Sequence, residues 1–275
     1  MTALKALFGD YPVTRALKSG AVSSPGLSLD FAKVALPQHA FKRVVRDLEF
    51  DVAELALVTY LLAKAHGKPY RLLPAVMTAR FQHPYLVCLA ETKYKPKDMQ
   101  RKRIGQRSYS VTTAAWVRGM LMEEGVDLSS IRWVTFEEPH VAEFRDPPNV
   151  ERAPAGKDMI AMLLAGELDA VIAGDIPTDE RIVPVYADPQ AAANAWREKH
   201  AAIQVNHMVV VRSEMASSLS DEIFALLKES RAAAGNPEMN PFGLEENRRN
   251  LEVAIDCVHR QGMIPRRFTV EELFE

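Results

Sequence analysis

The chain has 275 residues, of which 48% are hydrophobic and 25% charged, a composition typical of a globular protein with a substantial core. Its 34 basic and 36 acidic residues give a formal net charge of −2, so no long-range basic field favours nucleic acid as a partner. This length allows one large domain or two smaller ones.

Predicted strands and helices alternate through the first third of the chain. Apolar or alternating segments predict strands at 4–8, 27–31, 72–76 and 85–90. Apolar residues at helical spacing predict helices at 39–48 and 53–66. Glu54 lies near the start of the second helix on an otherwise apolar surface. The polar connection at 77–84 contains the cation Arg80 and the imidazole of His83.

The composition changes after Ala90, where six basic residues between 91 and 103 favour a solvated linker. A short strand at 102–105 then leads through a polar turn at 107–113 into a helix ending near Glu124. Ser110, Thr112 and Thr113 are expected to cap the start of this helix with their hydroxyl groups. Because free amides and the macrodipole favour anions there, and Arg107 adds a full positive charge, we predict an anion site. An ordinary hydroxyl cap with no ligand is the alternative.

Predicted strands and helices also alternate through the rest of the chain. Strands are predicted at 131–135, 150–153, 168–173, 182–185 and 205–212, and helices at 157–165, 190–200, 216–234 and 244–261. Thr269 and Glu272 have the spacing of a capping box. Alternation of strands and helices predicts an α/β fold with mainly parallel sheets.

Several functional motifs are absent from the sequence. It contains no phosphate-binding loop, dinucleotide fingerprint, HExxH helix or GxSxG elbow. No two of the seven histidines have the spacing of a local metal motif, so we expect no cofactor, although a divalent metal assembled from distant residues stays open. Charged residues interrupt the longest apolar tract, and the N-terminus has no apolar run of secretory length. We therefore expect a cytoplasmic protein with no membrane partner.

Five segments, in order along the chain, resemble one family. They are Phe8-Gly9-Asp10-Tyr11 with Thr14-Arg15, the stretches 49–55 with 60–63, 113–119 and 241–248, and the tail 265–274. Together they resemble the 4,5-dihydroxyphthalate decarboxylase family, which is similar in fold to type II periplasmic binding proteins.

That resemblance implies two α/β lobes with a ligand cleft between them. We expect lobe one to comprise 1–90 plus 205–275 and lobe two to comprise 91–204. Ligands of such sheets bind beyond the carboxyl ends of the strands. Loops in these places contain Asp10, Arg15 and Asp175, which we predict as further substrate-binding residues, although turn chemistry also explains both aspartates.

The resemblance also implies a chemistry. Removing CO2 from a dihydroxylated aromatic acid needs donors for the carboxylates, a polarised ring hydroxyl and an acid that protonates the ring. Arg80, Arg107, Ser110, Thr112 and Thr113 are the predicted carboxylate ligands, because guanidinium and hydroxyl donors suit carboxylates. For proton transfer, His83 is the first candidate and His207 the second, and Glu54 is expected to orient a hydroxyl or a histidine.

Structural roles compete with each of these assignments. Arg80 could form a salt bridge, and His83 could serve only to shape a turn. Glu54 could cap a helix or form an ion pair, and His207 could be a core residue whose hydrogen bonds are satisfied within the protein. The predicted function is accordingly a carboxy-lyase acting on a small carboxylated aromatic substrate. The alternative is a protein that binds an organic anion without turnover. A homo-oligomer is compatible with either function.

Overall fold

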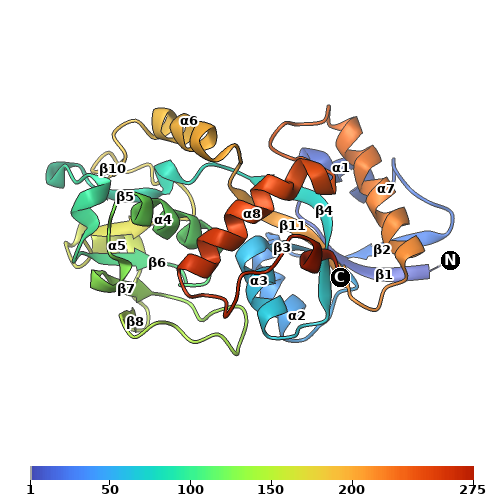
Figure 1. Ribbon diagram of the computed structural model, residues 1–275, viewed down its shortest axis with the longest axis horizontal. Coiled ribbons are helices and arrows are strands. Elements are labelled where there is room, and N and C mark those ends of the chain that lie inside the picture. The colour runs from blue at the N-terminus through green and yellow to red at the C-terminus, as the bar shows by residue number, and fades with distance from the viewer. Residues whose placement is uncertain (1) are drawn as a thin grey trace.

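The computed structural model describes residues 2–275 and contains two β-sheets, each covered by helices. The sheets lie towards opposite ends of the long axis of the molecule, and α8 crosses the region between them (Figure 1). We call the parts built on the two sheets lobe one and lobe two.

Lobe one is built on a five-stranded sheet in the order β2-β1-β3-β11-β4. Its strands are β1 (Thr2–Leu7), β2 (Leu27–Phe31), β3 (Val52–Ala56), β4 (Tyr70–Ala79) and β11 (Val205–Arg212). The first three are parallel, whereas β11 runs antiparallel to both β3 and β4. The α-helices of this lobe are α1 (Pro12–Lys18), α2 (Phe41–Val45), α3 (Leu57–Ala65), α7 (Ser217–Ala233) and α8 (Leu244–Arg260).

Lobe two is built on a six-stranded sheet in the order β10-β5-β9-β6-β7-β8. Its strands are β5 (Leu86–Leu89), β6 (Arg103–Gln106), β7 (Arg132–Thr135), β8 (Val150–Arg152), β9 (Ala170–Ile172) and β10 (Ile182–Pro184). Its α-helices are α4 (Thr112–Glu123), α5 (Met159–Leu164) and α6 (Pro189–His200). Short 3-10 helices add η1 (Pro37–Ala40), η2 (His83–Tyr85), η3 (Ala90–Thr92), η4 (Pro96–Met99), η5 (Leu128–Ser130) and η6 (Glu271–Phe274).

Strand pairing moves one of the expected lobe boundaries. β5 pairs with β9 and β10, so the segment at 86–90 belongs to the sheet of lobe two and not to lobe one. We therefore place the first crossing between the lobes at 80–85, directly after β4. The second crossing precedes β11, near the expected position at 205. Both sheets are mixed but mainly parallel, as predicted: within each sheet one strand runs against the others, β11 in lobe one and β5 in lobe two, and each of these strands directly follows a crossing.

The secondary structure around Glu54 also differs from the prediction. The run at 53–66 divides into the strand β3 and the helix α3, so the prediction of one helix was wrong and Glu54 lies on a central strand. Every residue of β3 is buried, and a strand buried on both faces has the continuous apolar sequence that a buried helix also has.

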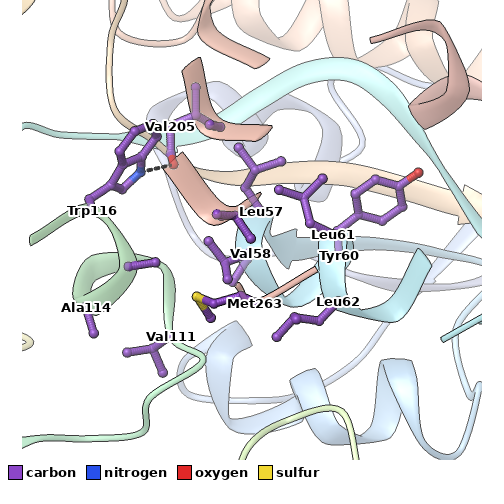
Figure 2. Packing of buried hydrophobic residues seen from close by; sticks show 14 of the residues in the cluster. Leu57, Val58, Tyr60, Leu61, Leu62, Val111, Ala114, Trp116, Val205 and Met263 are labelled. Atoms are coloured by element: carbon purple, nitrogen blue, oxygen red, sulfur yellow. Dashed lines mark hydrogen bonds between the residues drawn. The ribbon is translucent and has the colours of Figure 1, made fainter. Parts of the chain in front are cut away.

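The two lobes share a core formed by α3, α4 and α8. Figure 2 shows the part of this core in which α3 and α4 face each other. Trp116 of α4 donates its indole N–H to the carbonyl of Val205, 2.9 Å away, at the start of β11 (Figure 2). Gln261, which follows α8, donates to the carbonyl of Ala115 at 2.8 Å. Both bonds join lobe two to lobe one on the side where the helices pack.

The C-terminal capping box is confirmed, because Thr269 and Glu272 exchange hydrogen bonds between side chain and backbone. Among residues 2–275, no helix combines the length and the apolar character needed to cross a bilayer.

Candidate functional site

A cavity of about 520 Å³ lies between the two lobes. Lobe one lines it with residues from the carboxyl ends of β3 and β4, from the amino end of the antiparallel strand β11, and from η1 and α2: Leu36, Gln38, His39, Phe41, Ala56, Thr78, Ala79, Arg80, Asn206 and His207. Lobe two contributes the opposite wall: Arg107, Val111, Thr112, Thr113, Glu137, His140, Ile172, Ala173, Gly174 and Asp175. A cavity of this size can hold a single small aromatic molecule.

The N-terminus of α4 faces this cavity. Its N-cap residue is Val111 and no side chain caps the helix, so the predicted hydroxyl cap was wrong. Within the part of the chain that the structure describes, the amides of Thr112, Thr113 and Ala114 donate to no protein acceptor. The Thr112 hydroxyl instead accepts a hydrogen bond from the amide of Val58, 3.1 Å away in lobe one. The free amides leave an anion-binding helix end directed at the cavity.

Two guanidinium groups stand beside that helix end. Arg80 donates to the carbonyl of Gly174 at 2.8 Å, and its guanidinium carbon lies 3.9 Å from the centre of the Tyr85 ring. Arg107 lies 3.7 Å from the carboxylate of Glu137, which is long for a charge-assisted hydrogen bond. Both guanidinium groups therefore have donors available for a bound anion.

Opposite α4, His207 lines the cavity and Glu54 lies behind it. The Nδ1 atom of His207 is 2.6 Å from Oε1 of Glu54, whose side chain is fully buried. The carboxylate fixes the ring so that Nδ1 carries a proton and Nε2 is left for a ligand. A strand register that pairs β11 antiparallel with β3 brings these residues together across 153 positions of sequence.

The sequence analysis did not identify His140, which also lines the cavity. Burial, with smaller contributions from Arg107, Lys42 and His207, lowers its pKa to about 3. Its Nδ1 atom is 2.9 Å from the hydroxyl of Thr59, and its ring lies edge-on to Phe41, as does the ring of His207. His140 is therefore a neutral group at physiological pH. Its position after β7, at a carboxyl strand end, was the signal that could have found it.

Asp175 is an exposed residue of the lining, as its position after β9 led us to expect. Besides Glu54, which lies behind His207, four other predicted residues do not line this cavity. Asp10 is exposed and pairs with Lys18, and Arg15 is exposed on α1. Ser110 is buried with its hydroxyl 3.3 Å from that of Ser108.

His83 lies away from the cavity as well, packed against Tyr186 with the ring centres 5.0 Å apart. Burial lowers its pKa to about 4. Its Nδ1 atom is buried and has no hydrogen-bond partner among the described residues. These surroundings make His207 a better candidate than His83 for proton transfer, so we reverse the predicted order.

Two further polar residues of the lining, Thr78 and Asn206, were not selected from the sequence. The side-chain Nε2 of Gln82 donates hydrogen bonds to Oδ1 of Asn206, 2.9 Å away, and to the carbonyl of Arg80. Gln82 thus supports the lining and does not itself contact the cavity. Nowhere in residues 2–275 do three or more metal-ligating side chains of His, Cys, Asp or Glu come together.

The two lobes and the cavity between them define a protein of the type II periplasmic-binding-protein fold. The alkanesulfonate-binding protein SsuA from Xanthomonas axonopodis pv. citri, bound to MOPS, matches 99% of this chain and 98% of its own with a TM-score of 0.59 and 11% identity. The aliphatic sulphonate binding protein SsuA from Escherichia coli matches 99% and 92% at the same TM-score and identity. The desulfurization enzyme DSZB matches 99% and 96% with a TM-score of 0.54 and 13% identity, so the fold occurs in binding proteins and in an enzyme.

No family model matches the sequence. A 4,5-dihydroxyphthalate decarboxylase from Comamonas testosteroni is 31% identical over 244 residues, which are 82% of this chain and 74% of the relative. A second, from Pseudomonas putida, is 32% identical over 203 residues, 68% of this chain and 78% of the relative. The chain belongs to the 4,5-dihydroxyphthalate decarboxylase family.

Proposed function

We propose that this protein is a decarboxylase of an aromatic dicarboxylic acid and converts 4,5-dihydroxyphthalate, or a close analogue, to protocatechuate and CO2. The observation that carries the proposal is the cavity between the lobes. One wall offers hydrogen-bond donors for the carboxylates of a substrate, and the opposite wall holds a histidine that a buried glutamate orients. Family membership supports the same reaction.

The donors would hold the two neighbouring carboxylates of the substrate. The free amides of α4 suit one carboxylate, and the guanidinium groups of Arg80 and Arg107 suit both. The exposed carboxylates of Glu137 and Asp175 would repel a third anionic group. A dianion with one charged edge and one neutral, hydroxylated edge fits this distribution of charge.

His207 would supply the proton that the reaction consumes. In 4,5-dihydroxyphthalate each carboxylate is para to a hydroxyl, whose electrons make the carboxylate-bearing carbon basic. His207 first takes a proton from solvent on Nε2, while its Nδ1–H stays bonded to Glu54. The ring carbon then takes this Nε2 proton, the bond to the carboxylate breaks, and CO2 leaves as the ring regains its aromaticity and His207 returns to its neutral Nδ1–H form. One proton is consumed per CO2, and His207 regains it from solvent. Neutral His140 can accept a hydrogen bond from a ring hydroxyl.

The test is to incubate the full chain with 4,5-dihydroxyphthalate, with and without a chelator, and to follow protocatechuate and CO2. We expect many turnovers in the native protein, and in His207→Asn we expect retained binding with loss of turnover. Substrate binding measured by calorimetry without product would instead indicate an organic-anion binding protein. If the protein neither binds 4,5-dihydroxyphthalate nor forms product from it, the proposed substrate is refuted. A cytoplasmic location and self-association stay predictions.

A further inference from the structure

The Glu54 carboxylate has an unusual environment for a buried charge. It is fully buried, yet no lysine or arginine among the described residues pairs with it. Its donors are the amide of Gly9 at 2.9 Å to Oε2, the hydroxyl of Tyr11 at 2.8 Å to Oε1, and Nδ1 of His207 at 2.6 Å to Oε1. An unpaired buried carboxylate needs such donors, because desolvation without them is costly.

Two of the three donors come from the connection between β1 and α1, which together with the first helical turn (residues 9–14) we call the turn. The Tyr11 ring folds over Gly9 so closely that a Cβ atom at Gly9 would lie 2.5 Å from Cζ of the ring. Thr14 fixes the turn, since its hydroxyl donates to the carbonyl of Gly9 at 2.7 Å and accepts from the amide of Tyr11 at 3.0 Å. Only glycine allows this ring position, so the turn has a steric requirement that loop formation alone does not explain.

We propose that Tyr11 is a positioning residue, held over Gly9 so that its hydroxyl and the Gly9 amide aim the Glu54 carboxylate at His207. Tyr11 does not line the cavity between the lobes and acts through Glu54. This assigns to the turn at 9–14 a role that the sequence analysis gave to Asp10 and Arg15 as direct substrate ligands. The consequence for turnover depends on the proposed function, whereas the positioning itself does not.

The shared atom Oε1 provides a measurable consequence. Tyr11 and His207 both donate to it, so losing the Tyr11 hydroxyl leaves His207 as its single donor. The bond from Nδ1 of His207 should then strengthen, and the proton on Nδ1 should resonate further downfield. The titratable groups of the lining near His207 include His39 on η1 and His140, which shares the Phe41 ring with His207. Burial lowers the pKa of His140 to about 3, so His140 is neutral near pH 7 and does not disturb the measurement there. The other charged groups of the lining are Arg80, Arg107, Glu137 and Asp175.

The experiment compares three variants by proton and nitrogen NMR of the histidine side chains, with His207 assigned from its loss in His207→Asn. Tyr11→Phe removes the hydroxyl and keeps the ring, and Gly9→Ala keeps the hydroxyl but displaces the ring. Tyr70→Phe is the matched control, because the Tyr70 hydroxyl also donates to a buried acceptor, the carbonyl of Phe50. Tyr70 lies far from His207, since on β4 it is the strand neighbour of Arg212, at the opposite end of β11 from His207.

We expect a downfield shift of the His207 Nδ1 proton in Tyr11→Phe and Gly9→Ala, and none in Tyr70→Phe. With 4,5-dihydroxyphthalate we expect Tyr11→Phe to lower kcat about two- to tenfold at unchanged KM, which is less than the full contribution of a hydrogen bond to a carboxylate because Tyr11 acts through Glu54. An unmoved Nδ1 proton in both turn variants overturns the proposal, and so does an equal shift in Tyr70→Phe. Because NMR needs no substrate, failure of the decarboxylase assay in the native protein would refute the proposed function separately.

Discussion

Replacing Glu54 by glutamine tests the central pair of the proposed site. The substitution keeps the shape of the side chain and removes its charge. The glutamine oxygen can accept from the Gly9 amide where Oε2 now does, and the amide nitrogen then faces Nδ1 of His207 and the hydroxyl of Tyr11. His207 must therefore carry its proton on Nε2 and present Nδ1 as an acceptor, which is the wrong tautomer for a stabilised imidazolium.

The magnitude follows from the bond that is lost. A hydrogen bond to a charged partner contributes about 1.5–3 kcal/mol, and each 1.36 kcal/mol corresponds to about tenfold in rate. Glu54→Gln should therefore reduce kcat for protocatechuate formation about ten- to a hundredfold. KM should change little, because Glu54 does not line the cavity.

The matched control is Glu49→Gln, the same change five positions earlier. Glu49 pairs with Arg43 near the surface and has no contact with His207. Thermal unfolding of both variants separates loss of fold from loss of chemistry. A kcat within twofold of the native value, or an effect confined to KM, would refute the role assigned to Glu54.

Four further outcomes can be checked. Arg107→Gln should raise KM about tenfold in steady-state assays with little change in kcat, because a ground-state carboxylate contact is lost; an unchanged KM would remove Arg107 from the site. Thr112→Val should lower the free energy of unfolding in urea by about 1–3 kcal/mol, since the buried amide of Val58 loses its acceptor; no change would show that water replaces the hydroxyl. His83→Asn should retain turnover if the fold persists, and abolished turnover in a folded variant would restore His83 to the mechanism. The fourth concerns stability in acid. The pKa of His140 is about 3 in the folded protein and about 6.5 in the unfolded chain, so between these values the unfolded state binds one more proton. The stability that neutral His140 contributes is therefore fully present above about pH 6.5 and falls as the pH drops towards 3, by at most about 3 kcal/mol at pH 4. In His140→Asn this part of the pH dependence should disappear from urea titrations at pH 7 and pH 5, and an unaltered dependence would contradict it.

Local sequence patterns predicted most of the elements because each depends on neighbours along the chain. The strand at 205–212, the helix at 190–200 and the capping box of Thr269 are such cases. The pattern failed at 53–66, where a central strand and a buried helix have the same apolar run. It failed again at 110–113, where the Thr112 hydroxyl bonds to Val58 of the other lobe and not to its own helix.

The residues of the candidate site also fall into those that the sequence predicted and those that it did not. Cavity residues that follow a strand, such as Arg80, Arg107 and Asp175, were found from the sequence because the carboxyl-end rule needs only the order of elements. The rule also proposed Asp10 and Arg15, since it cannot tell a loop that faces the cavity from one that turns away. His140 follows β7 and also fits the rule, but nothing local showed that the other lobe would bury it against the cavity.

By itself, the sequence determined the α/β class, the order of most elements and the family, since these follow from periodicity and from motifs that persist in register along the chain. Tertiary structure alone decided which polar groups face one another. The contact between Glu54 and His207 joins positions 153 residues apart, and it exists because β11 returns from lobe two to pair antiparallel with β3. Sequence spacing carries no information about such a pairing, because strand register is set by the packing of the whole sheet.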